Sequence, residues 1–118
     1  SNHIKFLGFI DRKIQLQIMN NAVAVVQPSL CEGWSTVVED AKAMNQRILA
    51  SDLPVHKEQL QDYTAKLFFK KSLHEDLAQK MQQLLLLPFV RENKDYSIHR
   101  KFFAVEFLHA IEQAQPHP

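Results

Sequence analysis

The chain has 118 residues, of which 46% are hydrophobic and 23% charged, so it can form one soluble globular domain with a modest core. Its formal net charge of +1 comes without any long basic cluster, which argues against nucleic acid as the main partner. The leucine run at 84–87 is far shorter than the ~20 apolar residues that a membrane span needs.

The first part of the chain alternates between β-rich and helical patterns. Residues 4–10 (IKFLGFI) predict a strand, and Asp11 is suited to cap a helix over 12–21. Residues 22–27 (AVAVVQ) have no polar break before Gln27. This pattern predicts a strand buried on both faces, which is typical of a parallel sheet.

The central part continues the alternation. A helix is predicted from Thr36 to Met44, and Asn45 follows where a left-handed helix stop is expected. Residues 47–51 (RILAS) predict the next strand. After Pro54, the residues HKEQLQDY predict a short helix or turn.

The last part contains one more strand and two more helices. Residues 65–70 (AKLFFK) predict a strand, and Ser72 is expected to cap a helix that continues to about Leu87, with Glu75 at the capping-box position and Pro88 as its stop. A final helix is predicted over 95–115. About four strands alternating with helices predict an α/β fold with a parallel sheet.

The loop between residues 28 and 36 is the most informative segment. It follows a strand and precedes a helix, so backbone N–H groups and the positive end of the helix dipole converge there and favour an anion. Glu32 and Asp40 are placed to accept hydrogen bonds from hydroxyls beside that anion. A site for an anion together with hydroxyls suggests a sugar nucleotide.

Residues 28–59, PSLCEGWSTVVEDAKAMNQRILASDLPVHKEQ, resemble the signature region of retaining glycosyltransferases of the GT-B fold, glycosyltransferase family 4. FLGFI and AKLFFK resemble flanking strands, so the resemblance covers residues 4–114. Proteins of this family have two Rossmann-like domains, and the C-terminal one binds the donor. The resemblance implies that residues 1–118 are a partial C-terminal nucleotide-sugar-binding domain, and that the N-terminal domain is absent.

The resemblance also implies roles for individual residues. Glu32 is the candidate catalytic residue, because the family's first acid binds hydroxyls of the transferred sugar. Asp40 stands where most members have Glu and would accept hydrogen bonds from the ribose, whereas Glu39 should point elsewhere. Backbone amides near the sugar and the distal phosphate come from Gly33, Trp34, Ser35 and Thr36, and a nucleobase slot is expected at Phe9 and Ile10.

The chemistry that the resemblance implies needs neither a metal nor a protein nucleophile. The donor would be a nucleotide-diphospho-sugar such as a UDP- or GDP-sugar, no other cofactor is expected, and the acceptor is unknown. The histidines show no metal-ligand spacing. The family's Arg and Lys that pair with the diphosphate lie upstream of this chain, so residues 1–118 alone are not expected to transfer sugar.

The start of the chain has further consequences. Ser1 and Asn2 are interpreted as a tag remnant, and the abrupt strand-like start suggests a piece of a longer protein. In the family's strand order, 3-2-1-4-5-6, IKFLGFI is the third strand and AVAVV the fourth. Either these two strands pair directly, or exposed sheet edges pair with another molecule as a homodimer.

Purely structural interpretations of the same residues also remain open. Glu32 and Asp40 could be solvated acids near a helix start, Trp34 could be a packing residue, and His56 is expected to fix a turn rather than act as a base. Cys31, the only cysteine, is expected to be buried and inert, and its solitude fits a cytoplasmic protein, free or at the inner face of a membrane. A non-catalytic nucleotide- or protein-binding module derived from the same fold is the alternative function.

Overall fold

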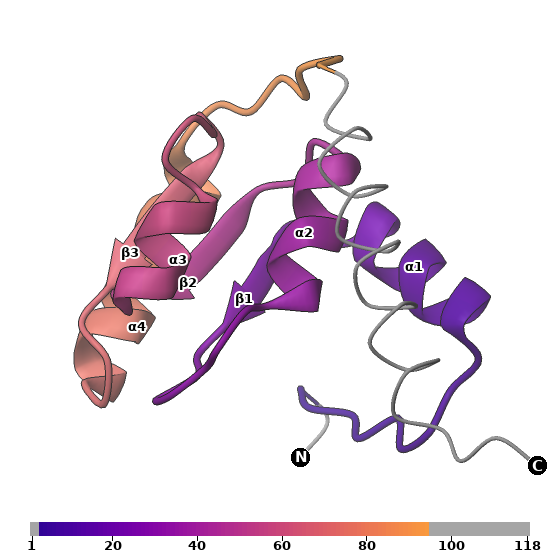
Figure 1. Cartoon of the computed structure of the whole chain (residues 1–118), viewed down its shortest axis with the longest axis horizontal. Coiled ribbons are helices and arrows are strands. Elements are labelled where there is room, and N and C mark those ends of the chain that lie inside the picture. The colour runs from indigo at the N-terminus through magenta and orange to yellow at the C-terminus, as the bar shows by residue number, and fades with distance from the viewer. Residues whose placement is uncertain (1–2, 95–118) are drawn as a thin grey trace, which may run out of the picture.

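The computed structural model describes residues 3–94, and the helix predicted over 95–115 lies outside the described residues (Figure 1). In the described part, helices and strands alternate as the sequence predicts. The elements are, in order, α1 (Arg12–Asn21), β1 (Val25–Gln27), α2 (Thr36–Ala43), β2 (Ile48–Ser51), α3 (Pro54–Gln59), β3 (Lys66–Phe69) and α4 (His74–Leu86).

The three strands form one parallel sheet in the order β1-β2-β3. Val25 pairs with Ile48, and Ile48 pairs with Lys66, so the strands share one register and their carboxyl ends meet at one edge of the sheet. The fold is therefore α/β with a small Rossmann-like parallel sheet, as expected. The described residues contain three strands instead of about four.

The prediction of a strand at residues 4–10 is wrong, because this segment has no strand assignment. Its aromatic side chains lie in solvent, with Phe6 97% exposed. Gly8 has a φ of 65°, a left-handed conformation that breaks an extended segment. An apolar run becomes a strand only when a neighbouring strand takes up its hydrogen bonds, and β1 pairs only with β2 in the described sheet. Direct pairing of IKFLGFI with AVAVV is thereby excluded for the described structure.

The sheet separates two apolar layers. On one face, Val38 and Ala41 of α2 pack with Ile48, Ala50 and Leu60. On the other face, Leu84 of α4 packs against Leu49 and Phe69, because side chains alternate between the faces of a strand. Figure 1 shows α2 and α3 on one side of the sheet and α4 on the other.

Local capping residues explain where most helices begin and end. The side chain of Asp11 accepts a hydrogen bond from the Lys13 amide at 3.0 Å and opens α1 as predicted. Asn45 has a φ of 55° just after α2, which confirms the left-handed stop. Helix α4 ends at Leu86, just before Pro88, also as predicted.

The predicted cap of α4 is wrong. Ser72 has a φ of 68°, which is incompatible with the extended backbone of an N-cap, and Leu73 occupies that position without a side-chain hydrogen bond. Asp76 of the first turn instead accepts a hydrogen bond from the Lys70 amide at 2.7 Å. The carboxylate therefore ties α4 back to the end of β3.

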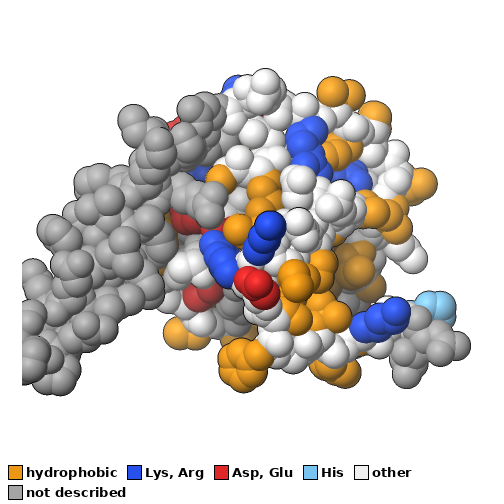
Figure 2. All heavy atoms as spheres, turned by 90° about the vertical axis from the view of Figure 1, so that its right-hand side faces the viewer, with side chains coloured by type: hydrophobic (Ala, Val, Ile, Leu, Met, Phe, Trp, Pro, Cys, Tyr) orange, Lys and Arg blue, Asp and Glu red, His pale blue; other side chains and the backbone are white. Residues whose placement is uncertain are grey.

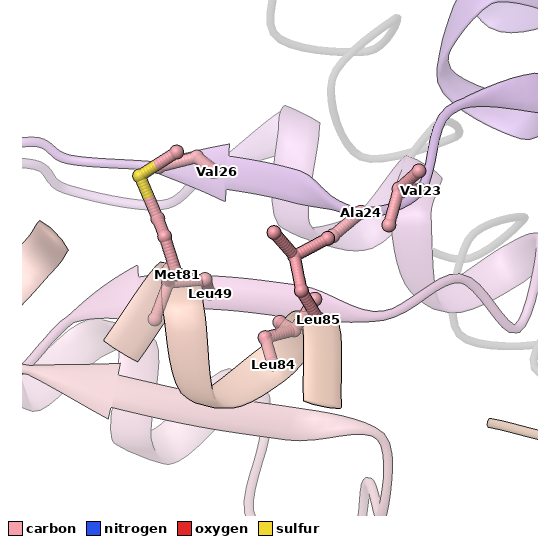
Figure 3. A pocket seen from close by; sticks show the side chains of 7 residues that line it. All are labelled: Val23, Ala24, Val26, Leu49, Met81, Leu84 and Leu85. Carbon is pink, nitrogen blue, oxygen red and sulfur yellow. The ribbon is translucent and has the colours of Figure 1, made fainter. Parts of the chain in front are cut away.

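The prediction that β1 is buried on both faces is also wrong, because Val26 is 36% exposed. A groove of about 170 Å³ runs between β1 and α4 (Figure 3). It is lined by Val23, Ala24, Val26, Leu49, Met81, Leu84 and Leu85. In the described sheet β1 is an edge strand, and α4 covers its outer face only in part.

The surface beside α1 carries exposed apolar side chains. Figure 2 shows them on the face that includes the N-terminal segment and α1, interspersed with basic side chains. They include Ile4, Phe6, Leu7, Phe9, Ile14 and Ile18. Among residues 3–94, no helix has both the length and the apolar character that crossing a membrane requires.

Candidate functional site

The carboxylate of Glu32 is held at the carboxyl end of β1. Gln27, the last residue of β1, donates a hydrogen bond from Nε2 to Glu32 Oε1 at 3.0 Å and another to Ser29 Oγ at 3.1 Å. The Glu32 side chain remains 21% exposed. The side chain is thus fixed by its own strand and loop while part of it faces solvent.

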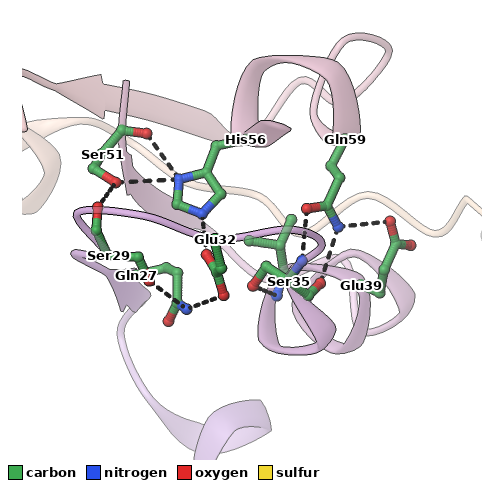
Figure 4. Close-up of polar contacts among 9 residues, drawn as sticks. Gln27, Ser29, Glu32, Ser35, Glu39, Ser51, His56 and Gln59 are labelled. Carbon is green, nitrogen blue, oxygen red and sulfur yellow. Dashed lines mark hydrogen bonds and ion pairs between the residues drawn. The ribbon is translucent and has the colours of Figure 1, made fainter. Parts of the chain in front are cut away.

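A buried histidine holds the other oxygen of the same carboxylate. His56 of α3 is fully buried, and its Nε2 lies 2.5 Å from Glu32 Oε2. Its Nδ1 lies 2.9 Å from the carbonyl oxygen of Ser51, at the end of β2, and the Ser51 hydroxyl donates to the Ser29 carbonyl at 2.6 Å. Figure 4 shows these contacts as one network that joins β1, β2 and α3.

The partners of the His56 ring determine where its protons lie. A carbonyl oxygen can only accept, so Nδ1 must carry a hydrogen that it donates to Ser51. Nε2 faces a carboxylate oxygen, and the contact requires one proton between the two atoms. The Glu32–His56 pair therefore shares a single proton along this contact.

These neighbours set the acidity of Glu32. Partial burial by itself would raise the pKa of Glu32, but hydrogen bonds from His56, Ser29 and Gln27, together with the charge of His56, hold that pKa below its ordinary value. Because the carboxylate form is favoured, Glu32 is a hydrogen-bond acceptor at neutral pH.

Sequence reasoning interpreted His56 as a residue that fixes a turn. It does so, through Ser51, but its contact with Glu32 was missed. The signal for that contact was topological. Glu32 follows β1 and His56 follows β2, and the carboxyl ends of neighbouring parallel strands lie side by side.

The start of α2 is held by a second polar cluster. The Ser35 side chain accepts a hydrogen bond from the Val38 amide at 3.1 Å and thereby caps the helix. Gln59 of α3 accepts from the Ser35 amide at 2.9 Å and donates to the Ser35 carbonyl at 2.9 Å (Figure 4). The Ser35 amide, one of the expected phosphate donors, is therefore engaged by Gln59.

The two acidic residues in the middle of α2 point to different neighbours, as expected. Glu39 accepts a hydrogen bond from Gln59 Nε2 at 3.0 Å and lies 3.7 Å from Lys42. Asp40 is buried and faces α1, where both of its oxygens lie 2.7 Å from the guanidinium of Arg12. The hydrogen bond to Asp40 raises the pKa of Arg12, which keeps the guanidinium charged.

The loop in front of α2 is open to solvent. Cys31, Gly33, Trp34 and Thr36 are exposed, so the expected burial of Cys31 is wrong. A Cβ atom built on Gly33 would meet no atom within 4 Å. This space is compatible with the close backbone approach that sequence reasoning assigns to Gly33, but that role stays a prediction.

The residues expected to bind the nucleobase lie at the surface of the described structure. Phe9 lies in solvent with a relative exposure of 110%, and Ile10 is 36% exposed. Their role also stays a prediction. Within residues 3–94, no group of three or more His, Cys, Asp or Glu side chains is arranged to hold a metal ion.

Comparison with known proteins agrees with this geometry at the level of the family. Residues 1–100 match the model of a protein family described as glycosyl transferases group 1. Comparisons with curated proteins and with solved structures found no match.

Proposed function

Because this chain belongs to the glycosyl transferases group 1 family, we propose that it is the donor-binding part of a retaining glycosyltransferase of family 4. The proposed donor is a nucleotide-diphospho-sugar such as a UDP- or GDP-sugar. The sugar would be transferred to an acceptor hydroxyl in glycan, polysaccharide or glycolipid biosynthesis. In this proposal, residues 1–118 belong to the C-terminal domain of a GT-B protein, and an N-terminal domain of the same protein binds the acceptor.

The proposal depends on the Glu32 carboxylate, which is held in one orientation and remains partly exposed. This carboxylate is fixed by Gln27 and His56 and is still partly exposed at the carboxyl edge of the sheet. Ligands of open α/β sheets bind at this edge. A carboxylate has about four lone-pair directions, so the hydrogen bonds from His56, Gln27 and Ser29 still leave acceptor capacity for sugar hydroxyls.

The N-terminus of α2 is suited to bind the diphosphate of the donor. Helix N-termini favour anions because their amides and dipole point outward. Since Gln59 engages the Ser35 amide, we assign the distal phosphate chiefly to the amides of Gly33 and Thr36. Ser35 then contributes by capping the helix, which holds these amides in place.

This arrangement suits glycosyl transfer. Breaking the bond between the sugar and the diphosphate places negative charge on the departing phosphate oxygen. Fixed N–H donors aimed at that oxygen stabilise the charge as it develops, which lowers the barrier without a protein nucleophile. Glu32 would hold the sugar by its hydroxyls while the acceptor attacks from the face that the phosphate leaves.

The proposed ribose contact of Asp40 has a structural condition. Both oxygens of Asp40 face Arg12, whose side chain is half exposed. Because the Asp40 side chain is 5% exposed, ribose can reach it only if the Arg12 guanidinium moves aside. Donor binding should therefore displace Arg12 toward solvent.

The test is a binding comparison with this chain. Dissociation constants are measured by NMR titration for UDP-glucose, GDP-mannose and ADP-glucose, each beside its nucleoside diphosphate. We expect at least one sugar nucleotide to bind. The Glu32→Gln variant should bind it about tenfold more weakly, because a charged acceptor for the sugar hydroxyls is lost.

A matched control is Glu75→Gln, because the Glu75 side chain is 86% exposed on α4 and outside the site. It should bind like the unmodified chain. Absence of binding by every sugar nucleotide, or equal weakening in both variants, contradicts the proposed donor site. Binding of the nucleoside diphosphates alone, with no effect of Glu32→Gln, would favour the non-catalytic nucleotide-binding module.

A further inference from the structure

We propose that His56 is a positioning residue, which aims the Glu32 carboxylate at the hydroxyls of the donor sugar. This inference rests on the proposed function. It concerns a side chain that is fully buried and cannot itself reach a ligand in solvent. Any effect of His56 on binding must therefore pass through Glu32.

His56 is fixed at both ring nitrogens. Nδ1 donates to the Ser51 carbonyl at 2.9 Å, and Ser51 Oγ lies 3.2 Å from the same nitrogen. The Ser51 hydroxyl is anchored in turn to the Ser29 carbonyl. The ring plane is thereby set by β2 and by the loop after β1, so Nε2 can point in only one direction.

The direction of His56 Nε2 selects one orientation of the Glu32 carboxylate. Nε2 meets Oε2 while Gln27 meets Oε1, so the carboxylate is held at both oxygens by residues of different elements. A glutamate in a surface loop otherwise samples several rotamers, and ordering it on binding costs affinity. A side chain already held in its binding orientation avoids that cost.

The proton between His56 and Glu32 determines whether the two side chains attract or repel each other. With one proton between Nε2 and Oε2, the contact is attractive. Without that proton, a ring lone pair would face the carboxylate and push Glu32 away from its position. His56 therefore supports Glu32 through this hydrogen bond, and Ser51 holds the ring in the orientation that makes it.

Two substitutions separate the structural role of His56 from its positioning role. In His56→Asn, the amide nitrogen can replace Nδ1 and keep the Ser51 bond, but nothing reaches Glu32. In His56→Gln, the longer side chain can place its amide nitrogen near the position of Nε2 and restore a donor to Glu32. His74→Asn is the matched control, since His74 is 90% exposed.

The readout is the ratio of two dissociation constants, that of the nucleoside diphosphate over that of its sugar nucleotide. We expect His56→Asn to lower this ratio about tenfold, with the affinity for the nucleoside diphosphate unchanged. His56→Gln should recover most of the ratio, and His74→Asn should leave it unchanged. A purely structural role would weaken both ligands together and would not be rescued by Gln.

The outcomes separate the two proposals. If the unmodified chain binds no sugar nucleotide, the proposed function is overturned and this inference with it. If it binds one and the ratio is the same in His56→Asn, only the inference is overturned. If His56→Asn does not fold, the ¹⁵N resonances of the His56 ring in the unmodified chain decide. A protonated Nδ1 and a proton shared with Glu32 support the inference, and an unprotonated Nδ1 overturns it.

Discussion

At the scale of single residues, the site combines a fixed acid with an open backbone. Glu32 is anchored by side chains from the strand before it and the helix after the next strand. Gly33 beside it is exposed and has free space where a side chain would stand. The acid would hold a ligand in place, and the glycine would let the ligand approach the main chain.

The free space beside Gly33 leads to a prediction. Gly33→Ala should change the free energy of unfolding by no more than about 0.5 kcal/mol, because the added Cβ meets no atom in the described structure. The same methyl group should weaken sugar-nucleotide binding about tenfold or more, because it occupies the approach path to the loop amides. Urea unfolding and NMR titration measure the two effects separately. Unaltered affinity would show that the ligand does not approach Gly33.

Sequence reasoning identified Glu32 as an acceptor but not the residue that supports it. Glu32 and His56 are 24 positions apart, and nothing in the local pattern joins them. Parallel topology brings their two loops together, and topology was predictable from the alternation of strands and helices. The contact between Glu32 and His56 depends on the orientation of the two side chains, which the hydrophobic periodicity of the sequence does not predict.

At the scale of elements, α3 holds the start of α2 in place through hydrogen bonds of Gln59. Gln59 is nearly fully buried and satisfies three groups, the Ser35 amide, the Ser35 carbonyl and the Glu39 carboxylate. The Lys42 ammonium adds a hydrogen bond to the Gln59 carbonyl at 2.6 Å. The loop before α2 is thus held from behind while its other side is exposed.

The contribution of these hydrogen bonds can be tested by removing the side-chain amide of Gln59. Gln59→Leu keeps the approximate volume but leaves the Ser35 backbone groups and Glu39 without this partner. The free energy of unfolding should fall by about 2–4 kcal/mol, because buried polar groups lose their hydrogen bonds. Urea denaturation measures the loss, and Gln61→Leu is the control because Gln61 is exposed. Equal stability of the two variants would mean that water replaces the Gln59 contacts.

The first turn of α4 gives a prediction about pH. The hydrogen bond from the Lys70 amide, together with Lys80, lowers the pKa of Asp76 below its ordinary value. A carboxyl whose pKa is lower in the folded state stabilises the fold above its unfolded pKa of about 3.9, and this contribution is lost as the pH falls through the folded pKa. The unmodified chain should therefore have a larger free energy of unfolding than Asp76→Asn at pH 7, and this difference should decline below pH ~4.

Urea midpoints at pH 7, 5 and 3 measure this difference. An advantage that stays constant across this range would show that the Asp76 charge does not contribute. The sequence predicted Ser72 as the cap of α4, with Glu75 at the capping-box position. The left-handed backbone of Ser72 moves the helix start by one residue and makes Asp76 the acid that is used.

At the scale of the whole molecule, β2 is the centre of the described structure. It pairs with a strand on each side, and its side chains enter both apolar layers. The sequence predicted this strand, the helices around it and their order, because their hydrophobic patterns are local. The failed prediction at residues 4–10 concerned a segment whose strand character depends on a partner that local pattern cannot supply.

Because β2 is central, substitutions in this strand should lower the free energy of unfolding the most. Leu49→Ala should lower the free energy of unfolding by about 2–4 kcal/mol, because Leu49 is 1% exposed and packs against Phe69 and Leu84. Leu85→Ala, on the neighbouring α4 and 67% exposed, should change it by about 0.5 kcal/mol or less. Urea denaturation compares the two. Similar losses would mean that the apolar layer beneath α4 is loosely packed.

The exposure of Cys31 has a practical consequence for experiments on the intact chain. It is the only cysteine, and it lies in the loop directly before Glu32. A maleimide dye or nitroxide would attach at this one point and report occupancy of the loop by fluorescence or by paramagnetic broadening. Without a reducing agent, two chains could also become cross-linked through this thiol, so molecular masses should be measured with the thiol reduced or alkylated.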